Sequence, residues 1–386
     1  MYKRVCIIGS SAAGIAAAIR LRQLVPTIDI VCITAEAGDP YNKCLLVDVL
    51  AGIKSDSEII TQSRNKLAEK NIKYCDNTRI TEIDRKNQIL RTDREAAISY
   101  DALLLTVGSE VRKIPEEYRA LKGVFVFHDR KDLESIKNYI KNRSVQTGII
   151  IGGGFTGLEC ADALWKLGLR VTVIEGGDRV LGSILHAHIA TEFTDYVSEN
   201  IDNFTIKINT QFHRVIENAG MCTGVEYTTN GNRDACDAQL VIFAWGVQSH
   251  DYLARTAGLA CAARGGVLVD EYMRSSDPHI YAAGDCAVVA PYNGICRTWQ
   301  LASFQGNIAA FNIAQMKRPY NPVIIHLNSH IGGVEIYGSG DPYISGELQC
   351  EKKGGYTLLQ VKREGALAHY SGFGTYPDLT ALKRSM

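Results

Sequence analysis

The sequence predicts an α/β fold in which two Rossmann-like domains, one inserted in the other, are followed by a small α+β C-terminal domain. Three observations indicate this fold. A glycine-rich turn between an apolar strand and an Ala-rich helix opens the chain, a fuller copy of the pattern begins at residue 148, and a later strand ends in Gly-Asp. A chain of 386 residues is long enough for two or three domains, each with its own apolar core.

The first strand–turn–helix lies at the N-terminus. Residues 5–8 are predicted to form a buried strand, and the turn has the spacing Gly9-x-Ser11-x-x-Gly14. A second strand, "IDIVCITAE", ends in Glu36. Small residues let such a turn approach a pyrophosphate, the helix N-terminus offers free N–H groups, and the acid accepts hydrogen bonds from ribose hydroxyls. Because serine replaces glycine at the middle position, the segment can also be interpreted as an ordinary strand–turn–helix without a nucleotide.

The pattern recurs in the middle of the chain. A strand over 148–151 leads into a turn, a helix to about Leu167, and a strand over 171–174 that ends at Glu175. The turn has all three fingerprint glycines, Gly152, Gly154 and Gly157. With the acid 18 residues past the last glycine, this copy favours a dinucleotide site over a helix that merely packs on a strand. Two dinucleotides are therefore expected on one chain.

The acid of the second copy predicts which nicotinamide nucleotide binds there. A 2′-phosphate beside Glu175 would meet like charge, and Gly176 and Gly177 supply no cation. We therefore expect NADH, with NADPH a poorer ligand. Arg179 is the nearest basic residue and keeps NADPH open.

The third element is a strand over 280–283 that runs into Gly284 and Asp285. An Asp at the carboxyl end of such a strand, behind a glycine, is placed to bind the polyol chain of a flavin. The alternative is that Asp285 caps a following helix, as an Asp after glycine often does.

Composition and charge argue against several other classes of protein. Forty-two basic residues balance forty-two acidic ones, so we expect no nucleic-acid or membrane partner. Eleven scattered cysteines without a C-x-x-C predict a reducing compartment, the cytoplasm, and no metal site. Lys3 and Arg4 before an apolar run imitate a secretory signal, but the same residues serve the first predicted strand.

Placed in order, these pieces resemble the two-dinucleotide-binding-domain flavoprotein oxidoreductases (the pyridine nucleotide-disulfide oxidoreductase family), and within them the NADH-dependent reductases of rubredoxin and ferredoxin. The segments that carry the resemblance are "IIGSSAAG", "ITAEAGDPYNKCLL", "YDALLLTVGS", "IIIGGGFTGLE", "VIFAWGV", "IYAAGDCA" and "RTWQLASFQGNIAAFNI". They span nearly the whole chain. The sequence departs from the family pattern at two places. "GVQSH" stands where the family usually has G-V-x-P-N, and His128 stands where arginine is usual. Both departures affect the detail of the nucleotide cleft and not the fold.

The resemblance implies FAD at the first fingerprint and NADH at the second. The residues it assigns to FAD are Gly9, Ser11, Ala13, Gly14, Glu36, Lys43, Thr106, Gly108, Asp285 and Trp299. Those it assigns to NADH are Gly152, Gly154, Gly157, Glu159, Glu175 and Gly246. The expected domains are a discontinuous FAD-binding domain at 1–115 and 246–316, an NADH-binding domain at 116–245 and a C-terminal interface domain at 317–386, with "RPYNP" as the linker.

Three of these side chains each have two interpretations. Glu159 is expected near the nicotinamide carboxamide, or is a first-turn glutamate that favours the helix dipole. Lys43 places a cation near the flavin, or is a solvated lysine. Trp299 flanks the flavin ring, or only packs.

Cys44, in "DPYNKCLLVDVLAG", separates two mechanisms. As a thiol at a helix N-terminus beside Lys43, it would have a stabilised thiolate. Single-cysteine members of the family carry a reactive cysteine in this helix, but about one residue nearer the glycine that ends it, and one residue turns a side chain by about 100°. The reductases of electron carriers commonly have proline here, which favours Cys44 as a small apolar substitute.

Three functions remain under consideration. The first is an FAD-dependent oxidoreductase that takes hydride from NADH and passes electrons to a small redox carrier protein, since no C-x-x-x-x-C relay exists. The second is a single-cysteine NADH-dependent reductase of disulfides (of the coenzyme A-disulfide type), peroxide or oxygen. The third is a redox-sensing flavoprotein of the apoptosis-inducing-factor type. A homodimer is compatible with all three.

Overall fold

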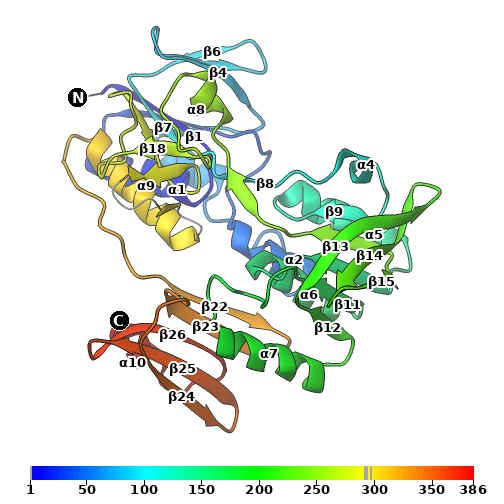
Figure 1. The fold of residues 1–386 in the computed structure, drawn as a ribbon. Helices are drawn as coiled ribbons and strands as arrows, with labels where there is room; N and C mark the ends of the chain where they lie inside the picture. The colour runs from blue at the N-terminus through cyan, green and yellow to red at the C-terminus, as the bar shows by residue number, and fades with distance from the viewer. Residues whose placement is uncertain (1, 291–293, 296–297) are drawn as a thin grey trace. The chain divides into compact units, whose positions relative to one another are not determined.

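The computed structural model describes residues 2–290, 294–295 and 298–386. The chain divides into two compact units (Figure 1). Unit 1 comprises Met1–Leu45, Ser55–Glu110 and Val247–Val323, and unit 2 comprises Leu46–Lys54, Val111–Gly246 and Ile324–Met386. No helix among the described residues is both long and apolar enough to cross a bilayer.

Unit 1 is built on a parallel five-stranded sheet. Its strands, in spatial order, are β19 (Ile280–Ala282), β7 (Ala102–Leu105), β1 (Arg4–Ile8), β2 (Asp29–Ile33) and β3 (Ile72–Cys75). All four residues of β7 and the last four of β1 are buried, as expected for the middle strands of a parallel sheet that is covered on both faces. The first predicted nucleotide-binding fold is thereby confirmed as an α/β sheet, although β2 ends before Glu36.

Two helices from opposite ends of unit 1 pack together (Figure 1). They are α1 (Ala12–Leu24), which follows the glycine-rich turn, and α9 (Trp299–Ile313). A Cβ on Gly306 would lie 2.2 Å from the carbonyl oxygen of Ala13, so only glycine lets the backbone of α9 approach α1 this closely. The contact joins the first residues of the chain to the segment after residue 298.

The remaining elements of unit 1 are short. They are the 3-10 helix η1 (Lys43–Leu45), the helices α3 (Arg64–Glu69) and α8 (Tyr252–Thr256), the antiparallel strands β4 (Ile80–Asp84), β5 (Ile89–Thr92) and β6 (Ala97–Ser99), the strands β18 (Val267–Val269), β20 (Ala287–Val289) and β21 (Gly294–Ile295), and the pair β8 (Ser109–Val111) and β17 (Val247–Ser249).

Unit 2 repeats the same plan, which confirms the predicted duplication. Its parallel sheet has the order β12 (Phe204–Lys207), β11 (Arg170–Ile174), β10 (Thr147–Ile151), β16 (Leu240–Phe243) and β9 (Val124–Val126). The helix α6 (Phe155–Lys166) connects β10 to β11 and ends one residue before the predicted Leu167. The other elements are α2 (Leu46–Leu50), α4 (Glu116–Arg119), α5 (Arg130–Asn142), α7 (Ala187–Asn200), β13 (Thr210–Asn218), β14 (Met221–Thr229) and β15 (Asn232–Asp237).

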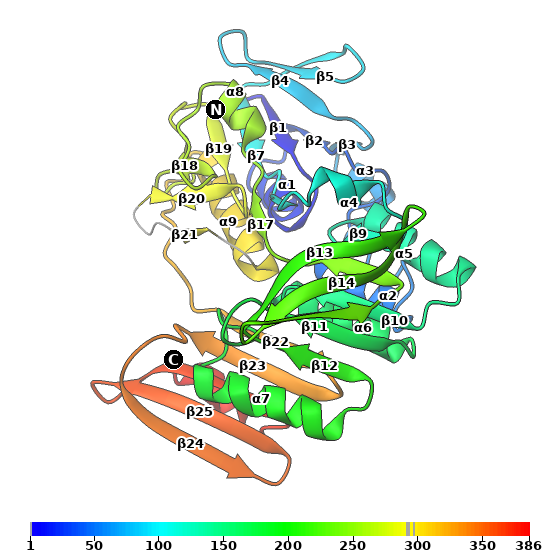
Figure 2. The same ribbon diagram turned by 45° about the vertical axis from the view of Figure 1, so that its right-hand side comes forward.

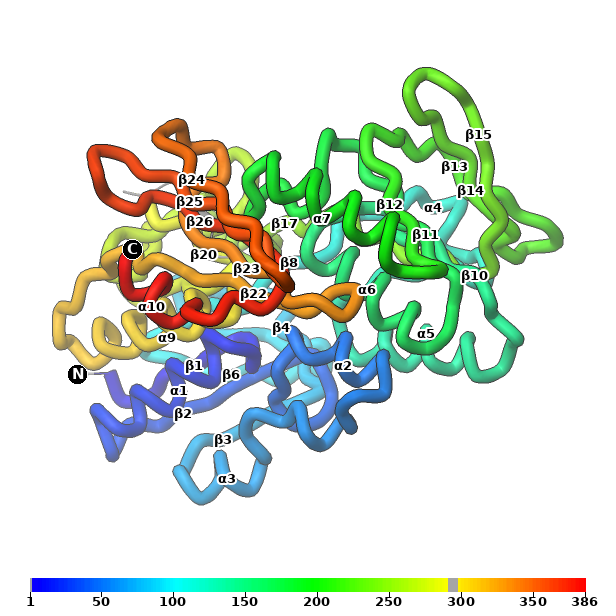
Figure 3. The backbone as a smooth tube through the Cα atoms, turned by 90° about the horizontal axis from the view of Figure 1, so that it is seen from below, coloured from blue at the N-terminus to red at the C-terminus, as the bar shows by residue number. Residues whose placement is uncertain are grey.

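The C-terminal part of unit 2 is an antiparallel sheet with one helix, as the predicted α+β class requires. The strands, in spatial order, are β22 (His326–Ile331), β23 (Val334–Gly340), β26 (Ala366–Gly374), β25 (Tyr356–Arg363) and β24 (Glu347–Lys353), and α10 (Leu379–Arg384) ends the chain. The helix α7 contacts β25 and β26 as well as β12 (Figure 2), and β22 lies beside α6 (Figure 3).

Three boundaries between the two units lie close to the predicted domain boundaries. The units change at Glu110/Val111, Gly246/Val247 and Val323/Ile324, each within about seven residues of a predicted boundary. They also change at Leu45/Leu46 and Lys54/Ser55, because Leu46–Lys54 belongs to unit 2, inside the range predicted for the FAD-binding domain. The C-terminal sheet belongs to the same compact unit as residues 111–246. The predicted linker "RPYNP" lies inside unit 1, where Tyr320 is buried and its N–H donates to the Glu271 carbonyl at 2.6 Å. A three-domain assignment with separate functions stays a prediction.

Candidate functional site

The first glycine-rich turn is held against strand β7. Gly9 has φ +106°, and a Cβ there would lie 2.1 Å from the carbonyl oxygen of Thr106. A Cβ on Gly14 would lie 2.0 Å from the carbonyl oxygen of Gly9. The hydroxyl of the buried Thr106 donates to the carbonyl oxygens of Ile8 at 2.9 Å and Gly9 at 3.0 Å. The turn therefore needs glycine at both positions because backbone atoms of Thr106, directly after β7, and of the turn itself fill the space.

The N-terminus of α1 carries free donors above this turn. The first bond of the helix runs from Ile15 N–H to the Ser11 carbonyl at 3.1 Å, and the Ser11 side chain makes no capping bond. Within the described chain, no acceptor is found for the N–H groups of Ala12, Ala13 and Gly14, although all three residues are buried. Buried amides at a helix N-terminus fit a pyrophosphate, so the residues present fit the FAD that the sequence predicts.

Glu36, the predicted ribose acid, lies just past β2 and already has two partners. The ammonium of Lys43 lies 2.7 Å from its Oε1, and the hydroxyl of Tyr41 donates to Oε2 at 2.6 Å. A carboxylate oxygen can accept more than one hydrogen bond, so these contacts are compatible with a ribose hydroxyl at Glu36. Lys43 therefore binds Glu36, and its position beside the flavin ring stays a prediction.

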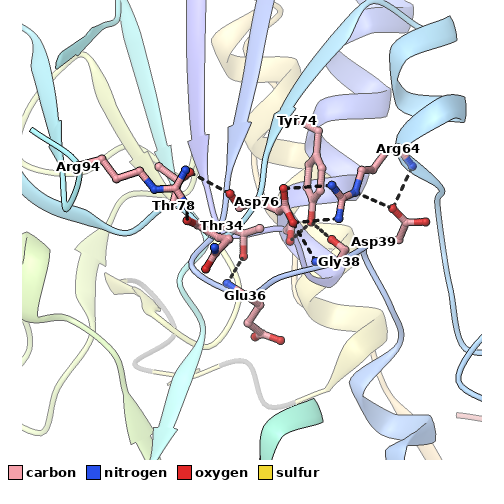
Figure 4. A network of polar contacts seen from close by, with 11 residues as sticks. Thr34, Glu36, Gly38, Asp39, Arg64, Tyr74, Asp76, Thr78 and Arg94 are labelled. Atoms are coloured by element: carbon pink, nitrogen blue, oxygen red, sulfur yellow. Dashed lines mark hydrogen bonds and ion pairs between the residues drawn. The ribbon is translucent and has the colours of Figure 1, made fainter. Parts of the chain in front are cut away.

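Arg64, on α3, fixes the loop that carries Glu36, and sequence reasoning missed it (Figure 4). Its guanidinium binds Asp39 at 3.1 Å and Asp76 at 2.9 Å, and Asp76 also accepts from the Gly38 N–H at 2.9 Å. The Tyr74 hydroxyl donates to the Gly38 carbonyl at 3.1 Å. These partners come from three separate segments, so no local spacing could have revealed the network.

The Gly284–Asp285 corner is fixed by side chains from elsewhere in unit 1. The Gly284 N–H donates to the buried Gln305 amide oxygen at 2.9 Å, and the Ser109 hydroxyl donates to Asp285 Oδ2 at 3.2 Å. The Ser249 hydroxyl donates to the Asp285 carbonyl at 2.7 Å. The carboxylate is thereby held at the carboxyl end of β19, where a flavin polyol is expected. The helix-cap interpretation of Asp285 has no support, because β20 follows this corner.

Two further predicted FAD residues lie in the same unit. Gly108 has φ +73° and its carbonyl accepts from the N–H of His250, one of the residues that departs from the family pattern. Trp299 is the first residue of α9 and packs, half-buried, against the apolar core of unit 1. Residue 297, where its family-like segment begins, lies outside the described residues.

The second glycine-rich turn has the geometry of the first. Gly152 has φ +115°, and a Cβ there would lie 2.5 Å from the carbonyl oxygen of Ala244 on the neighbouring segment. A Cβ on Gly157 would lie 1.9 Å from the Gly152 carbonyl oxygen, whereas one on Gly154 would meet nothing within 4 Å. The first bond of α6 runs from Leu158 N–H to the Gly154 carbonyl at 3.0 Å. The turn can therefore receive a second dinucleotide.

Glu175 lies directly after β11 and is held at this turn by backbone amides. Its Oε2 accepts from the Gly153 N–H and its Oε1 from the Gly177 N–H, both at 2.6 Å. The acid therefore faces the same turn as the fingerprint glycines, as the pattern predicts. Gly246, the last predicted NADH residue, has φ +106° and its carbonyl accepts from the Arg112 N–H at 3.1 Å.

Glu159 lies on α6 and faces the C-terminal sheet. Its Oε1 accepts from the Ser329 hydroxyl at 2.8 Å. Burial raises the pKa of this carboxyl from 4.5 to about 7, the Ser329 bond opposes the rise, and the carboxylates of Asp48 and Asp162 add to it. In the neutral form, Glu159 can donate a hydrogen bond near neutral pH.

We expect Glu159 to make the fold less stable as the pH rises. Below about pH 4.5 the carboxyl is neutral in both states. Between about 4.5 and about 7 the unfolded chain releases its proton first, so the free energy of unfolding falls by up to about 3 kcal/mol as pH rises through the folded pKa. The melting temperature should therefore fall more for wild type than for Glu159→Gln as the pH rises from about 5 to about 8. Identical pH profiles of the two proteins, with exposed Glu199→Gln as control, would contradict this.

Cys44 is exposed, so the expectation that it is a small apolar residue packed in this loop is wrong. It lies in η1, not in an α-helix, and the α2 that follows has only five residues. A turn this short adds little dipole to stabilise a thiolate. The Cys44 N–H donates to the Asn42 side chain at 3.0 Å, and the neighbouring Lys43 is paired with Glu36. Both features that were expected to activate the thiol are therefore weaker than the sequence indicates.

Two glycine-rich turns on parallel sheets, each with an acid after the second strand, fit two dinucleotides on one chain. The chain belongs to the pyridine nucleotide-disulphide oxidoreductase family, whose model matches residues 3–306. The protein is an FAD-containing NAD(P)H-dependent oxidoreductase, which confirms the predicted enzyme class and the predicted pair of FAD and a nicotinamide nucleotide.

Two relatives and one solved structure are similar to this chain. An NADH oxidase from Methanocaldococcus jannaschii is 31% identical over 360 residues, which cover 90% of this chain and 78% of that protein. A rhodocoxin reductase from Rhodococcus erythropolis is 32% identical over 317 residues, 79% of this chain and 69% of that protein. The structure of a NAD-dependent persulfide reductase from A. fulgidus matches with a TM-score of 0.86 at 23% identity, covering 99% of this chain and 77% of that one. Their names differ in the electron acceptor.

Proposed function

We propose that the protein oxidises NADH in preference to NADPH and passes the electrons to a small redox carrier protein of the rubredoxin or ferredoxin type. The observation that supports this acceptor is the setting of Cys44. Lys43 is paired with Glu36 at 2.7 Å and the helix after Cys44 has five residues, so the two features expected to stabilise a thiolate at Cys44 are both weakened. The similarity to a rhodocoxin reductase agrees with a carrier protein as acceptor.

The residues form two nucleotide-binding sites, one for FAD and one for NADH. FAD, when bound, would accept hydride from the nicotinamide and release electrons to the carrier. The amides at the start of α1 bind its pyrophosphate, Glu36 its ribose and Asp285 its polyol chain. The amides at the start of α6 bind the pyrophosphate of NADH, and Glu175 binds its adenosine ribose. In this assignment, residues 1–115 and 246–316 form the FAD domain, 116–245 the NADH domain and 317–386 the C-terminal domain.

Glu175→Ala should shrink the preference for NADH. A hydrogen bond from a ribose hydroxyl to this carboxylate contributes about 1.5–3 kcal/mol, roughly ten- to a hundredfold in kcat/KM. Its loss should lower kcat/KM for NADH while kcat/KM for NADPH falls less, because the repulsion of the 2′-phosphate is also removed. Steady-state assays with both nucleotides and one acceptor measure the ratio, with the exposed acid Glu199→Ala as control. Equal use of both nucleotides by wild type would show that the acid does not contact the ribose.

A single-cysteine reductase of disulfides, persulfides, peroxide or oxygen is the second candidate. The exposure of Cys44 and the similarity to a persulfide reductase and an NADH oxidase favour it. The two candidates differ in the acceptor that supports turnover. Purified protein should therefore be assayed with NADH against rubredoxin, ferredoxin, coenzyme A disulfide, polysulfide, hydrogen peroxide and oxygen. Fast turnover only with the small molecules would reject the carrier protein as acceptor.

A further inference from the structure

Arg179 lies in the loop after Glu175, and its side chain is buried in an unusual setting. Only 13% of the side chain is exposed, and its Nε has no hydrogen-bond partner among the described residues. Its contact with the carboxylate of Asp178 is long, at 3.4 Å. The guanidinium instead lies 4.7 Å from the ring centroid of Tyr343, which follows strand β23 and is itself 68% exposed. A cation–π contact therefore holds the charged end of this arginine.

The same loop brings Arg179 next to the ribose acid. A Cβ on Gly177 would lie 3.0 Å from Oε1 of Glu175 and 3.8 Å from the carbonyl oxygen of Arg179, so these two groups are neighbours. The charged end of the Arg179 side chain, however, lies against Tyr343 and Gly182. A Cβ on Gly182 would lie 3.4 Å from the Arg179 Nε and 3.5 Å from the Tyr343 hydroxyl. In the part of the chain that the structure describes, no ion pair joins Arg179 to Glu175.

A 2′-phosphate bound beside Glu175 would need a cation to offset the repulsion of the carboxylate. Arg179 is the basic residue of this loop, and the glycines at 176, 177 and 182 leave room for its side chain to turn. Turning it toward the ribose breaks the contact with Tyr343. A cation–π contact at a partly exposed site shifts an equilibrium about two- to thirtyfold.

We propose that Tyr343 sets the choice of nucleotide by holding the Arg179 guanidinium away from the adenosine ribose. Tyr343 is a positioning residue, because it acts through Arg179. The inference rests on the proposed binding of NADH at Glu175 and adds a second determinant of specificity from the C-terminal sheet. Both residues belong to unit 2, and their contact needs no other part of the chain.

Tyr343→Ala tests the proposal. It should raise the ratio of kcat/KM for NADPH to that for NADH about two- to thirtyfold, chiefly through a lower KM for NADPH. Tyr343→Phe keeps the ring and should leave the ratio as in wild type. The double variant Tyr343→Ala/Arg179→Ala should lose the gain, because the released cation is then absent. An unchanged ratio in Tyr343→Ala, or an equal gain in the double variant, would overturn the proposal.

Binding of 2′,5′-ADP and 5′-AMP to the holoenzyme, measured by calorimetry, gives a readout without turnover. Tyr343→Ala should tighten 2′,5′-ADP by a similar factor and leave 5′-AMP unchanged. Equal changes for both ligands would show that the tyrosine merely supports the loop, and would reject its role in specificity. If wild type fails to oxidise NADH or to bind 5′-AMP, the proposed function itself fails, which distinguishes the two outcomes.

Discussion

Gly14→Ala is expected to give a protein that retains no FAD. The new Cβ would lie 2.0 Å from the Gly9 carbonyl oxygen and 2.7 Å from the Thr106 hydroxyl, and both atoms are fixed by the sheet. The start of α1 must therefore move, and it takes the free amides of the helix with it. Overpacking against backbone costs about 1–3 kcal/mol or more, and the lost phosphate contacts add to this. Flavin absorbance per chain after purification and reconstitution measures the result.

Ala16→Ser is the matched control for this variant. It adds one atom to the same helix, at a half-buried position two residues further on. It should keep about one FAD per chain, as wild type does. Gly14→Ala with a full complement of FAD would contradict the account of the turn, and colourless wild-type protein that takes up no flavin would contradict the account of the whole site.

Gly157→Ala should retain FAD but lose reduction by NADH. The Cβ would lie 1.9 Å from the Gly152 carbonyl oxygen, the tightest such distance in either glycine-rich turn. The start of α6 must shift, and Glu175, which binds the Gly153 amide, shifts with the turn. We expect kcat/KM for NADH to fall about a hundredfold or more, which corresponds to about 3 kcal/mol. Stopped-flow absorbance of the flavin under anaerobic conditions measures this loss.

The neighbouring Gly154 provides a control within the same turn. Its φ is −76°, which any residue adopts, and a Cβ there meets nothing within 4 Å. Gly154→Ala should therefore fold as wild type does. Its comparison with Gly157→Ala separates the effect of a Cβ that displaces the turn from the effect of a glycine-to-alanine change alone. Dithionite should reduce the flavin in all three proteins. Unimpaired reduction of Gly157→Ala by NADH would show that the nucleotide does not use this turn.

The two glycine-rich turns could be predicted because their chemistry is local. A strand, three small residues at fixed spacing and a helix N-terminus lie within about 15 residues, so one short sequence pattern contains every part of the phosphate-binding turn. The alternation of apolar and polar residues on both sides of "REG" (363–365) likewise predicts a hairpin, and the structure has one between β25 and β26. This turn is local too, since Glu364 and Gly365 both adopt positive φ, as a two-residue turn requires. Its position in the sheet, between β23 and β24, depends on long-range pairing and was not predicted.

The partners of the predicted acids could not be found in this way. The bond between Lys43 and Glu36 changes the expected role of the lysine, and it depends on how a loop without regular structure folds back. Arg64 fixes that loop from a separate helix, and Tyr343 contacts Arg179 across more than a hundred intervening residues. Neither contact joins residues at a fixed, short spacing, so no sequence motif predicts it. The sequence therefore identified the acids and missed the side chains that orient them.

The most direct test of the central claim is NADH-dependent reduction of rubredoxin by Cys44→Ser, compared with wild type. If electrons pass from FAD to a carrier protein, the variant should keep most of its turnover. Anaerobic NADH should then reduce the flavin of wild type without a long-wavelength thiolate-to-flavin charge-transfer band. Loss of turnover in Cys44→Ser with FAD still bound, together with such a band in wild type, would contradict the claim and make Cys44 the redox-active group.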